Sequence, residues 1–224
     1  MTIDFLGLET APAVRRRVEE VFHVDRALPD YVFRKPYRFT LMEEFGFSLR
    51  FINILHDGKF CLRDEKILMS VLEPDPYVAR YAQMGKLNAA CFPADISEAD
   101  YADLTWRDPS DKAIPLVEDA EIVVWIPERA DWAMWGQRGR EITVIGFDDP
   151  ALADFLVNHD GYWIDAESAV NDFARARYIG RKTPEDFARP LIENYGSRAQ
   201  LREKLAAAGV TAPDYFSDAW ADGA

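Results

Sequence analysis

The chain has 224 residues, of which 49% are hydrophobic, a share that supports a folded core and excludes wholesale disorder. Its 39 acidic and 26 basic residues give a formal net charge of −13, which would repel a phosphate backbone and an anionic membrane surface. We therefore expect neither nucleic-acid nor membrane binding; an acidic surface suits a basic protein partner, although solubility alone is the commoner reason for such a charge.

The cysteines and the N-terminus carry no sign of a zinc site, a disulfide framework or export. Cys61 and Cys91 form no C-x-x-C motif and sit among apolar neighbours, which predicts buried free thiols. The N-terminal residues lack the features of a signal peptide, and no apolar stretch is long enough to span a bilayer. A cytoplasmic protein is expected.

The first quarter of the chain predicts one helix and one hairpin. Apolar residues at helical spacing indicate an amphipathic helix over 12–28, whereas 31–41 fits neither period and is expected to be extended or irregular. Two β-forming runs within 46–63 flank Asp57-Gly58, which is a strong hairpin signal because this dipeptide readily adopts a tight turn.

The next part predicts a strand, a helix and a long loop. The run from Ile67 to Leu72 indicates a strand. Asp75, followed by proline, is expected to cap a helix that runs to about Leu87. The stretch 92–115 is rich in Asp, Pro and Ser, which indicates a loop or lid with at most one helical turn.

The densest β-forming sequence lies between 121 and 147 and predicts an antiparallel meander of three strands. An unbroken apolar run opens it, and two further runs follow. A two-residue turn at Arg138-Gly139 would pair Trp135 with Ile142 and place apolar side chains opposite each other.

The last third of the chain predicts helices. Four helices are predicted, each with apolar side chains at helical spacing. The residues that can start them are Asp149, Asp165, Thr183 and Ser197. The expected fold is α+β, with a mostly antiparallel sheet covered by helices and a helical C-terminal part. We expect a core domain over 1–180, with 181–224 as a helical hairpin and tail packed on it.

A binding surface is one hypothesis for the turn of the meander. Trp132, Trp135, Arg138 and Arg140 lie around it, and Trp and Arg are the side chains most enriched at binding hot spots. Strand alternation places the two tryptophans on opposite faces, so at least one belongs to the core. The alternative is that the tryptophans pack the core and the arginines cover them.

A metal site is the second hypothesis. His56-Asp57 and His159-Asp160 each precede a glycine, and two such pairs, joined by His23, could hold a divalent cation that activates water for hydrolysis. The alternative is that Asp-Gly makes a turn and the histidine precedes it. The ligand spacing matches no standard zinc motif.

Motifs of known enzymes and nucleotide-binding loops are missing from the sequence. It contains no G-x-S-x-G nucleophile elbow, no G-x-G-x-x-G and no G-x-x-x-x-G-K-[ST]. We therefore expect no cofactor and favour a protein that is not an enzyme.

The segment 132–173 contains, in order, Trp135 to Gly139, Ile142 to Ile145, Leu152 to Leu156 and Tyr162 to Asp165. With these residues it resembles the C-terminal part of bacterial domains of unknown function, some of which are similar to immunity or toxin-neutralising proteins. The resemblance implies a bacterial accessory protein and lends no catalytic residue. Together with the charge it predicts a non-catalytic, acidic, immunity-like or regulatory protein-binding factor; a metal-dependent hydrolase and a structural subunit of a homo-oligomer are the alternatives.

Overall fold

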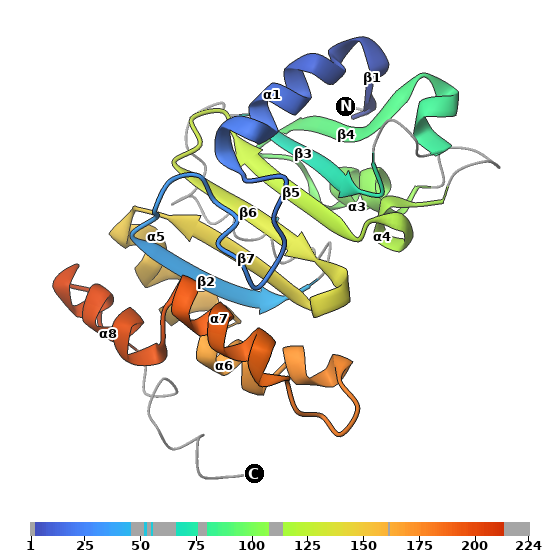
Figure 1. Cartoon of the computed structure of the whole chain (residues 1–224). Helices are drawn as coiled ribbons and strands as arrows, with labels where there is room; N and C mark the ends of the chain where they lie inside the picture. The colour runs from blue at the N-terminus through green and yellow to red at the C-terminus, as the bar shows by residue number, and fades with distance from the viewer. Residues whose placement is uncertain are drawn as a thin grey trace.

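A computed structural model describes residues 3–45, 52, 55, 66–75, 80–107, 114–160 and 162–212. In this part of the chain, antiparallel strands form one seven-stranded sheet in the order β1-β4-β3-β5-β6-β7-β2 (Figure 1). The strands are β1 (Phe5–Gly7), β2 (Phe39–Glu44), β3 (Lys66–Glu73), β4 (Lys86–Pro93), β5 (Ile122–Pro127), β6 (Trp132–Gln137) and β7 (Ile142–Phe147).

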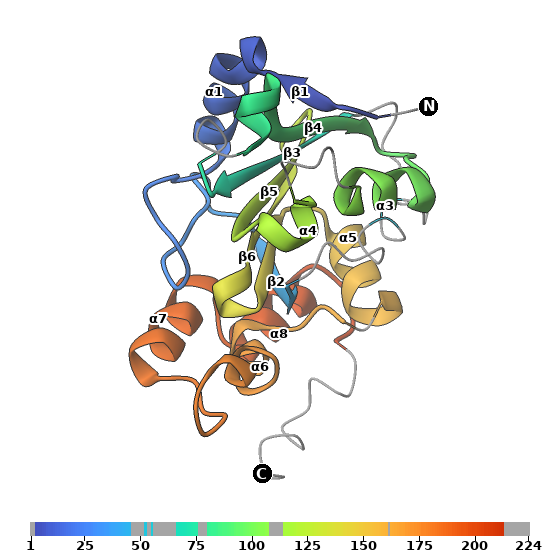
Figure 2. The same cartoon turned by 90° about the vertical axis from the view of Figure 1, so that its right-hand side faces the viewer.

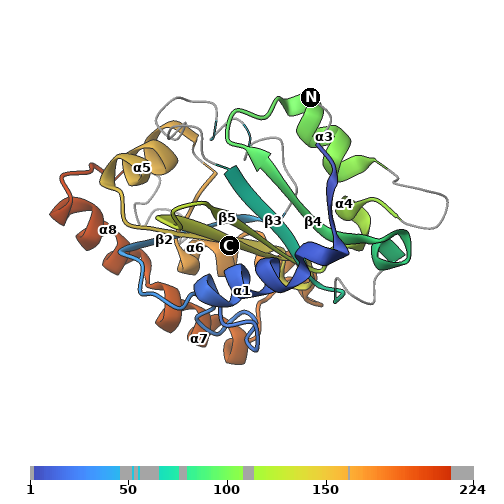
Figure 3. The ribbon, with the colours of Figure 1, turned by 90° about the horizontal axis from the view of Figure 1, so that it is seen from above.

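Helices pack on both faces of the sheet, so the protein is α+β, as the sequence predicts (Figure 3). The α-helices are α1 (Ala11–Val21), α3 (Glu98–Trp106), α4 (Leu116–Asp119), α5 (Pro150–Phe155), α6 (Ala166–Asn171), α7 (Glu185–Tyr195) and α8 (Arg198–Ala207). Short 3-10 segments are η1 (Leu8–Thr10), η2 (Arg80–Met84), η3 (Arg138–Arg140) and η5 (Ala174–Arg177), and η4 (Leu156–Asp160) is a π-helix.

Strand alternation divides the buried side chains between two cores. In β6, Trp132 and Met134 face one core, while Ala133 and Trp135 face the other. Side chains from α3, α4, α5 and α8 complete what we call the first core. Those from α1, α6 and α7 complete the second core. The central strands are buried on both faces, which explains why β5 reads as an unbroken apolar run.

The predicted meander is confirmed, but its predicted register is wrong. Trp135 pairs with Val144, and Gln137 pairs with Ile142. The connection contains four residues rather than two, because η3 is followed by Glu141 in the left-handed region at φ 56°. A shift by two positions keeps each side chain on its predicted face, since the strand repeat is two residues.

Three helix boundaries differ from the predictions. The first helix ends at Val21 rather than near residue 28, because Phe22 forms a bridge with Phe33. The prediction of a helix that reaches Leu87 is wrong at its C-terminal end, because η2 ends at Met84 and the chain then enters β4. Residues 76–79 of the predicted helix lie outside the described ranges. The predicted loop at 92–115 contains α3.

The predicted hairpin around Asp57-Gly58 falls outside the described residues, as does Cys61. Ile52 and Leu55 are described, and both are helical and buried in the first core, so the prediction of a strand there is wrong at these two positions. Cys91 is exposed, not buried as predicted, because its position in β4 is the one whose side chain the surrounding elements leave uncovered.

Three of the four C-terminal helices begin at the predicted residue; the fourth, α7, has Pro184 as its N-cap rather than Thr183, whose hydroxyl donates to the Val170 carbonyl. Asp149 accepts a hydrogen bond from the Ala151 amide at 2.8 Å, and Asp165 caps α6. Ser197 and Gln200 form the predicted capping box at the start of α8. Capping side chains therefore fix these helix starts locally, which is why the sequence identifies them.

The outer strands of the sheet are β1 and β2. β1 has three residues and pairs with β4 through Phe5 and Ala90. On the outer side of β2, Met42 and Ile164 exchange two backbone hydrogen bonds of 2.8 Å each. The segment before α6 thus lies against the outer side of β2.

Replacing Asn88 by leucine should raise the free energy of unfolding by about 1–3 kcal/mol, because a buried amide without partners carries a desolvation penalty of this size. Asn88 is fully buried on β4, and neither its Oδ1 nor its Nδ2 has a partner among the described residues. Urea unfolding followed by circular dichroism measures the change. Asn158→Leu is the control and should be destabilising, because the Asn158 amide donates to Asp154 and Thr211 at 2.9 Å. A less stable Asn88→Leu protein would contradict the prediction.

Candidate functional site

The two tryptophans of the predicted binding surface lie inside the protein. Trp132 is 4% exposed in the first core, and Trp135 is 1% exposed in the second core. Alternation along β6 sends them to opposite faces, as expected. Neither indole ring is therefore available to a partner in this structure.

The two arginines of the same prediction make contacts within the protein. The Arg138 Nε donates to the Ala120 carbonyl at 2.7 Å, and its guanidinium lies 5.2 Å from the ring centre of Phe45. Arg140 donates to the Tyr178 hydroxyl at 3.0 Å. These contacts tie the β6–β7 connection to neighbouring segments. The rings beside the two guanidinium groups are Phe45 and Phe187, not the tryptophans that the packing alternative expected them to cover. Binding of a partner by the arginines stays a prediction.

The predicted metal site cannot be assembled from the described side chains. His56 and Asp57 lie outside the described residues, and so do the side chains of His159 and Asp160, whose backbone belongs to η4. Within the described ranges, no group of three His, Cys, Asp or Glu side chains is placed to hold a metal ion, His23 included. The metal site stays a prediction.

An exposed tryptophan stands at the end of α3. The helix begins at Ser97, whose hydroxyl accepts from the Asp100 amide at 3.1 Å and donates to the Asp100 carboxylate at 2.7 Å. Tyr101 and Leu104 are buried and attach α3 to the first core. Trp106, the last residue of the helix, is 62% exposed, whereas each other described tryptophan is at most 4% exposed.

The helices α3 and α4 pack against each other (Figure 2), and both carry acidic residues. We define the α3–α4 face as Trp106 together with the carboxylates of Asp95, Glu98, Asp100, Asp103, Glu118 and Asp119. Such an array favours the approach of a cationic partner, because the potential of several like charges adds over a surface.

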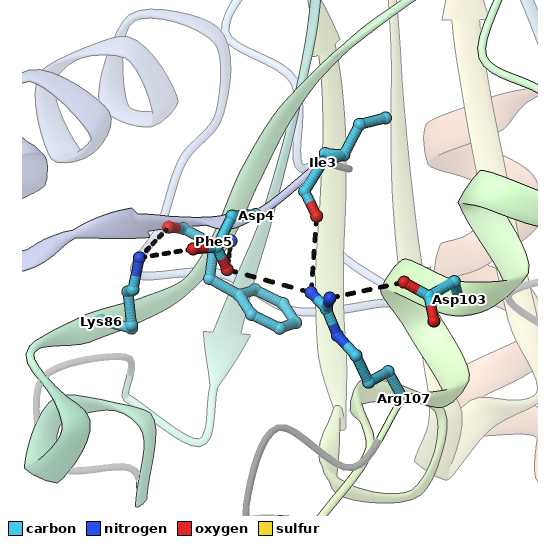
Figure 4. Close-up of polar contacts among 6 residues, drawn as sticks. All are labelled: Ile3, Asp4, Phe5, Lys86, Asp103 and Arg107. Carbon is cyan, nitrogen blue, oxygen red and sulfur yellow. Dashed lines mark hydrogen bonds and ion pairs between the residues drawn. The ribbon is translucent and has the colours of Figure 1, made fainter. Parts of the chain in front are cut away.

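Arg107 is the basic residue next to this face, and its charge is already paired (Figure 4). Its guanidinium lies 3.4 Å from Asp103 and 3.8 Å from Asp4, and it donates to the Ile3 carbonyl at 3.4 Å. Lys86 also donates to Asp4, at 2.7 Å, and this hydrogen bond lowers the pKa of the Asp4 carboxyl. These contacts hold the end of α3 beside the start of β1. Because Arg107 is already paired, the carboxylates dominate the charge of the α3–α4 face.

Sequence reasoning missed α3 because it treated 92–115 as a loop. Ser97-Glu98-Ala99-Asp100 is a Ser-x-x-Asp capping signal, and buried residues follow at helical spacing. That signal could have placed Trp106 at the end of a helix.

Comparison with known proteins finds no family model, no curated protein and no solved structure that matches this chain. No helix in the described part of the chain has the length and apolar character needed to cross a membrane.

Proposed function

We propose that this chain is a non-catalytic protein-binding factor that holds a basic partner protein through the α3–α4 face. The observation that carries the proposal is the 62% exposure of Trp106, at the end of a helix rich in acidic residues, in a chain that buries its other described tryptophans. An exposed tryptophan can act as the anchor of a protein interface, because this side chain is enriched among binding hot spots.

The two kinds of side chain on the face would have different roles. Tryptophan is the most effective anchor at protein interfaces, because its large ring loses contact with water when a partner covers it. The exposed carboxylates would contribute less to affinity, since water and salt screen them, but they would steer a basic partner and speed its association. The net charge of −13 adds to the same attraction.

The partner belongs to the same proposal. The resemblance of 132–173 to immunity-like bacterial domains favours a toxin as the partner, and a cytoplasmic location would follow. Immunity proteins are expected to be encoded beside the toxins that they neutralise, so the products of the genes flanking that of this chain are the candidates to test.

Trp106→Ala should weaken binding of a flanking gene product about 30-fold, because truncation of a hot-spot tryptophan costs about 2 kcal/mol or more. Isothermal titration calorimetry at 150 mM salt would measure the dissociation constants. Glu98→Lys should slow association and reduce its dependence on salt, because it reverses one charge of the face.

Ile179→Ala is the matched control, because Ile179 is another exposed large apolar side chain but lies outside the α3–α4 face. It should leave the dissociation constant unchanged. Equal binding by the Trp106→Ala and Ile179→Ala proteins would overturn the assignment of the surface. Failure of every flanking product to bind would overturn the immunity-like assignment.

A further inference from the structure

A cleft of about 230 Å³ lies between α1 and the β3–β4 part of the sheet, away from the α3–α4 face. Its walls are apolar and are formed by Ala11, Val14, Val18, Leu72, Leu87 and Ala89. The exposed side chains of Arg15, Glu19 and Asp75 also line it, which places charged groups at its open side. Val24, another lining residue, is 46% exposed. The cleft therefore has an apolar interior and a charged mouth.

The cleft exists because small side chains meet on the sheet beneath α1. Ser70 of β3 lies opposite Ala89 of β4 in the strand register. The apolar cluster of Ala11, Leu87 and Ala89 is separate from the second core, to which Val18 belongs. Larger side chains at these sheet positions would join the two clusters, since protein interiors otherwise pack closely.

Ser70 gives the apolar interior a hydrogen-bonding group. It is 1% exposed and it lines the cleft. A ligand or a water molecule in the cleft that reached its hydroxyl could form a hydrogen bond with it. The hydroxyl can donate or accept, so it can pair with an alcohol or a carbonyl group.

We propose that this cleft binds a small neutral molecule with a compact apolar body and one hydroxyl or carbonyl group, which pairs with Ser70. The volume lies below the roughly 300–1,000 Å³ of sites that hold drug-sized ligands, so the ligand is smaller than these. A carboxylate or an ammonium group would have to lose its hydration beside apolar walls, and at the mouth Arg15 and Glu19 already pair with each other at 3.9 Å. A neutral group needs only the single hydrogen bond that Ser70 provides.

The test uses the full chain and three probes that share one ring: cyclohexanol, cyclohexane carboxylate and cyclohexylamine. Titrations followed by amide chemical shifts in NMR give the site and the affinity of each probe. Cyclohexanol should give saturable shifts confined to amides around residues 14–18, 70–72 and 87–89. Ser70→Ala should weaken it about fivefold, the equivalent of one neutral hydrogen bond.

Two variants fill the cleft, and a third serves as the control. Ala89→Leu fills it from the sheet and Val14→Phe fills it from the helix, so the second is available if the first does not fold; either should abolish the shifts. Ala99→Leu adds the same side chain at an exposed position of α3 and should bind like the unaltered protein. Unsaturable shifts with cyclohexanol, unchanged binding in a filled variant, or tighter binding of either charged probe would overturn the proposal.

Discussion

Replacing Trp135 by alanine should lower the free energy of unfolding by about 3–5 kcal/mol, the usual cost of truncating a buried aromatic side chain. Trp135 is 1% exposed on the central strand β6, and its ring centre lies 5.6 Å from that of Phe22 in the second core. The loss comes from packing, because the indole Nε1 has no hydrogen-bond partner among the described residues. Urea unfolding followed by far-ultraviolet circular dichroism would measure it.

Trp106→Ala is the matched control for stability. Trp106 is 62% exposed, so its removal should change the free energy of unfolding by no more than about 0.5 kcal/mol, as surface substitutions usually do. The two substitutions thus separate stability from binding. Trp135→Ala should lower the free energy of unfolding, whereas Trp106→Ala should lower only the affinity for the partner. Similar stability losses in both variants would show that exposure does not distinguish their roles.

Replacing Asp165 by alanine should cost about 3–5 kcal/mol, because it removes the buried carboxylate that faces the partly buried charge of Arg198. The Asp165 side chain is 1% exposed and lies 3.4 Å from the Arg198 Nε, whose side chain is 13% exposed. The carboxylate also accepts from the Ser168 amide at 2.9 Å and from the Ser168 hydroxyl at 2.6 Å. One side chain therefore caps α6 and holds the first turn of α8.

Asp149→Ala provides the comparison, since Asp149 caps α5 from an exposed position. Its loss should cost about 1 kcal/mol, which is typical of a helix cap alone. Asp165→Asn should fall between the two alanine variants, because asparagine preserves the cap but not the charge. Chemical unfolding of the three variants gives the ranking, and a loss in Asp165→Ala no greater than in Asp149→Ala would contradict the role given to Arg198.

The sequence predicted the elements whose signals are local. Side-chain caps at Asp149, Asp165 and Ser197 fix helix starts within a few residues, and the apolar run of β5 identifies a strand buried on both faces. The register of the meander depends on the length of the β6–β7 connection. Arg138-Gly139 is a weak turn signal, and the left-handed conformation of Glu141 could not be deduced from its residue type.

The elements that the sequence missed depend on distant neighbours. β4 contains Leu87, Ala89 and Ala90, whose residue types favour a helix in isolation, but pairing with β1 and β3 holds the segment extended. For the candidate site, alternation placed Trp132 and Trp135 on opposite faces but could not give their exposure. Trp106 was not considered because its helix was taken for a loop.

The bridge between Met42 and Ile164 bears on self-association. Unpaired strand edges can recruit a second chain and extend a sheet into aggregates. At β2, an incoming strand would first have to displace Ile164 from its two backbone hydrogen bonds, and at the opposite edge β1 offers only three residues for pairing. Both edges of the sheet therefore make it unfavourable for a second copy of the chain to add a strand by backbone pairing.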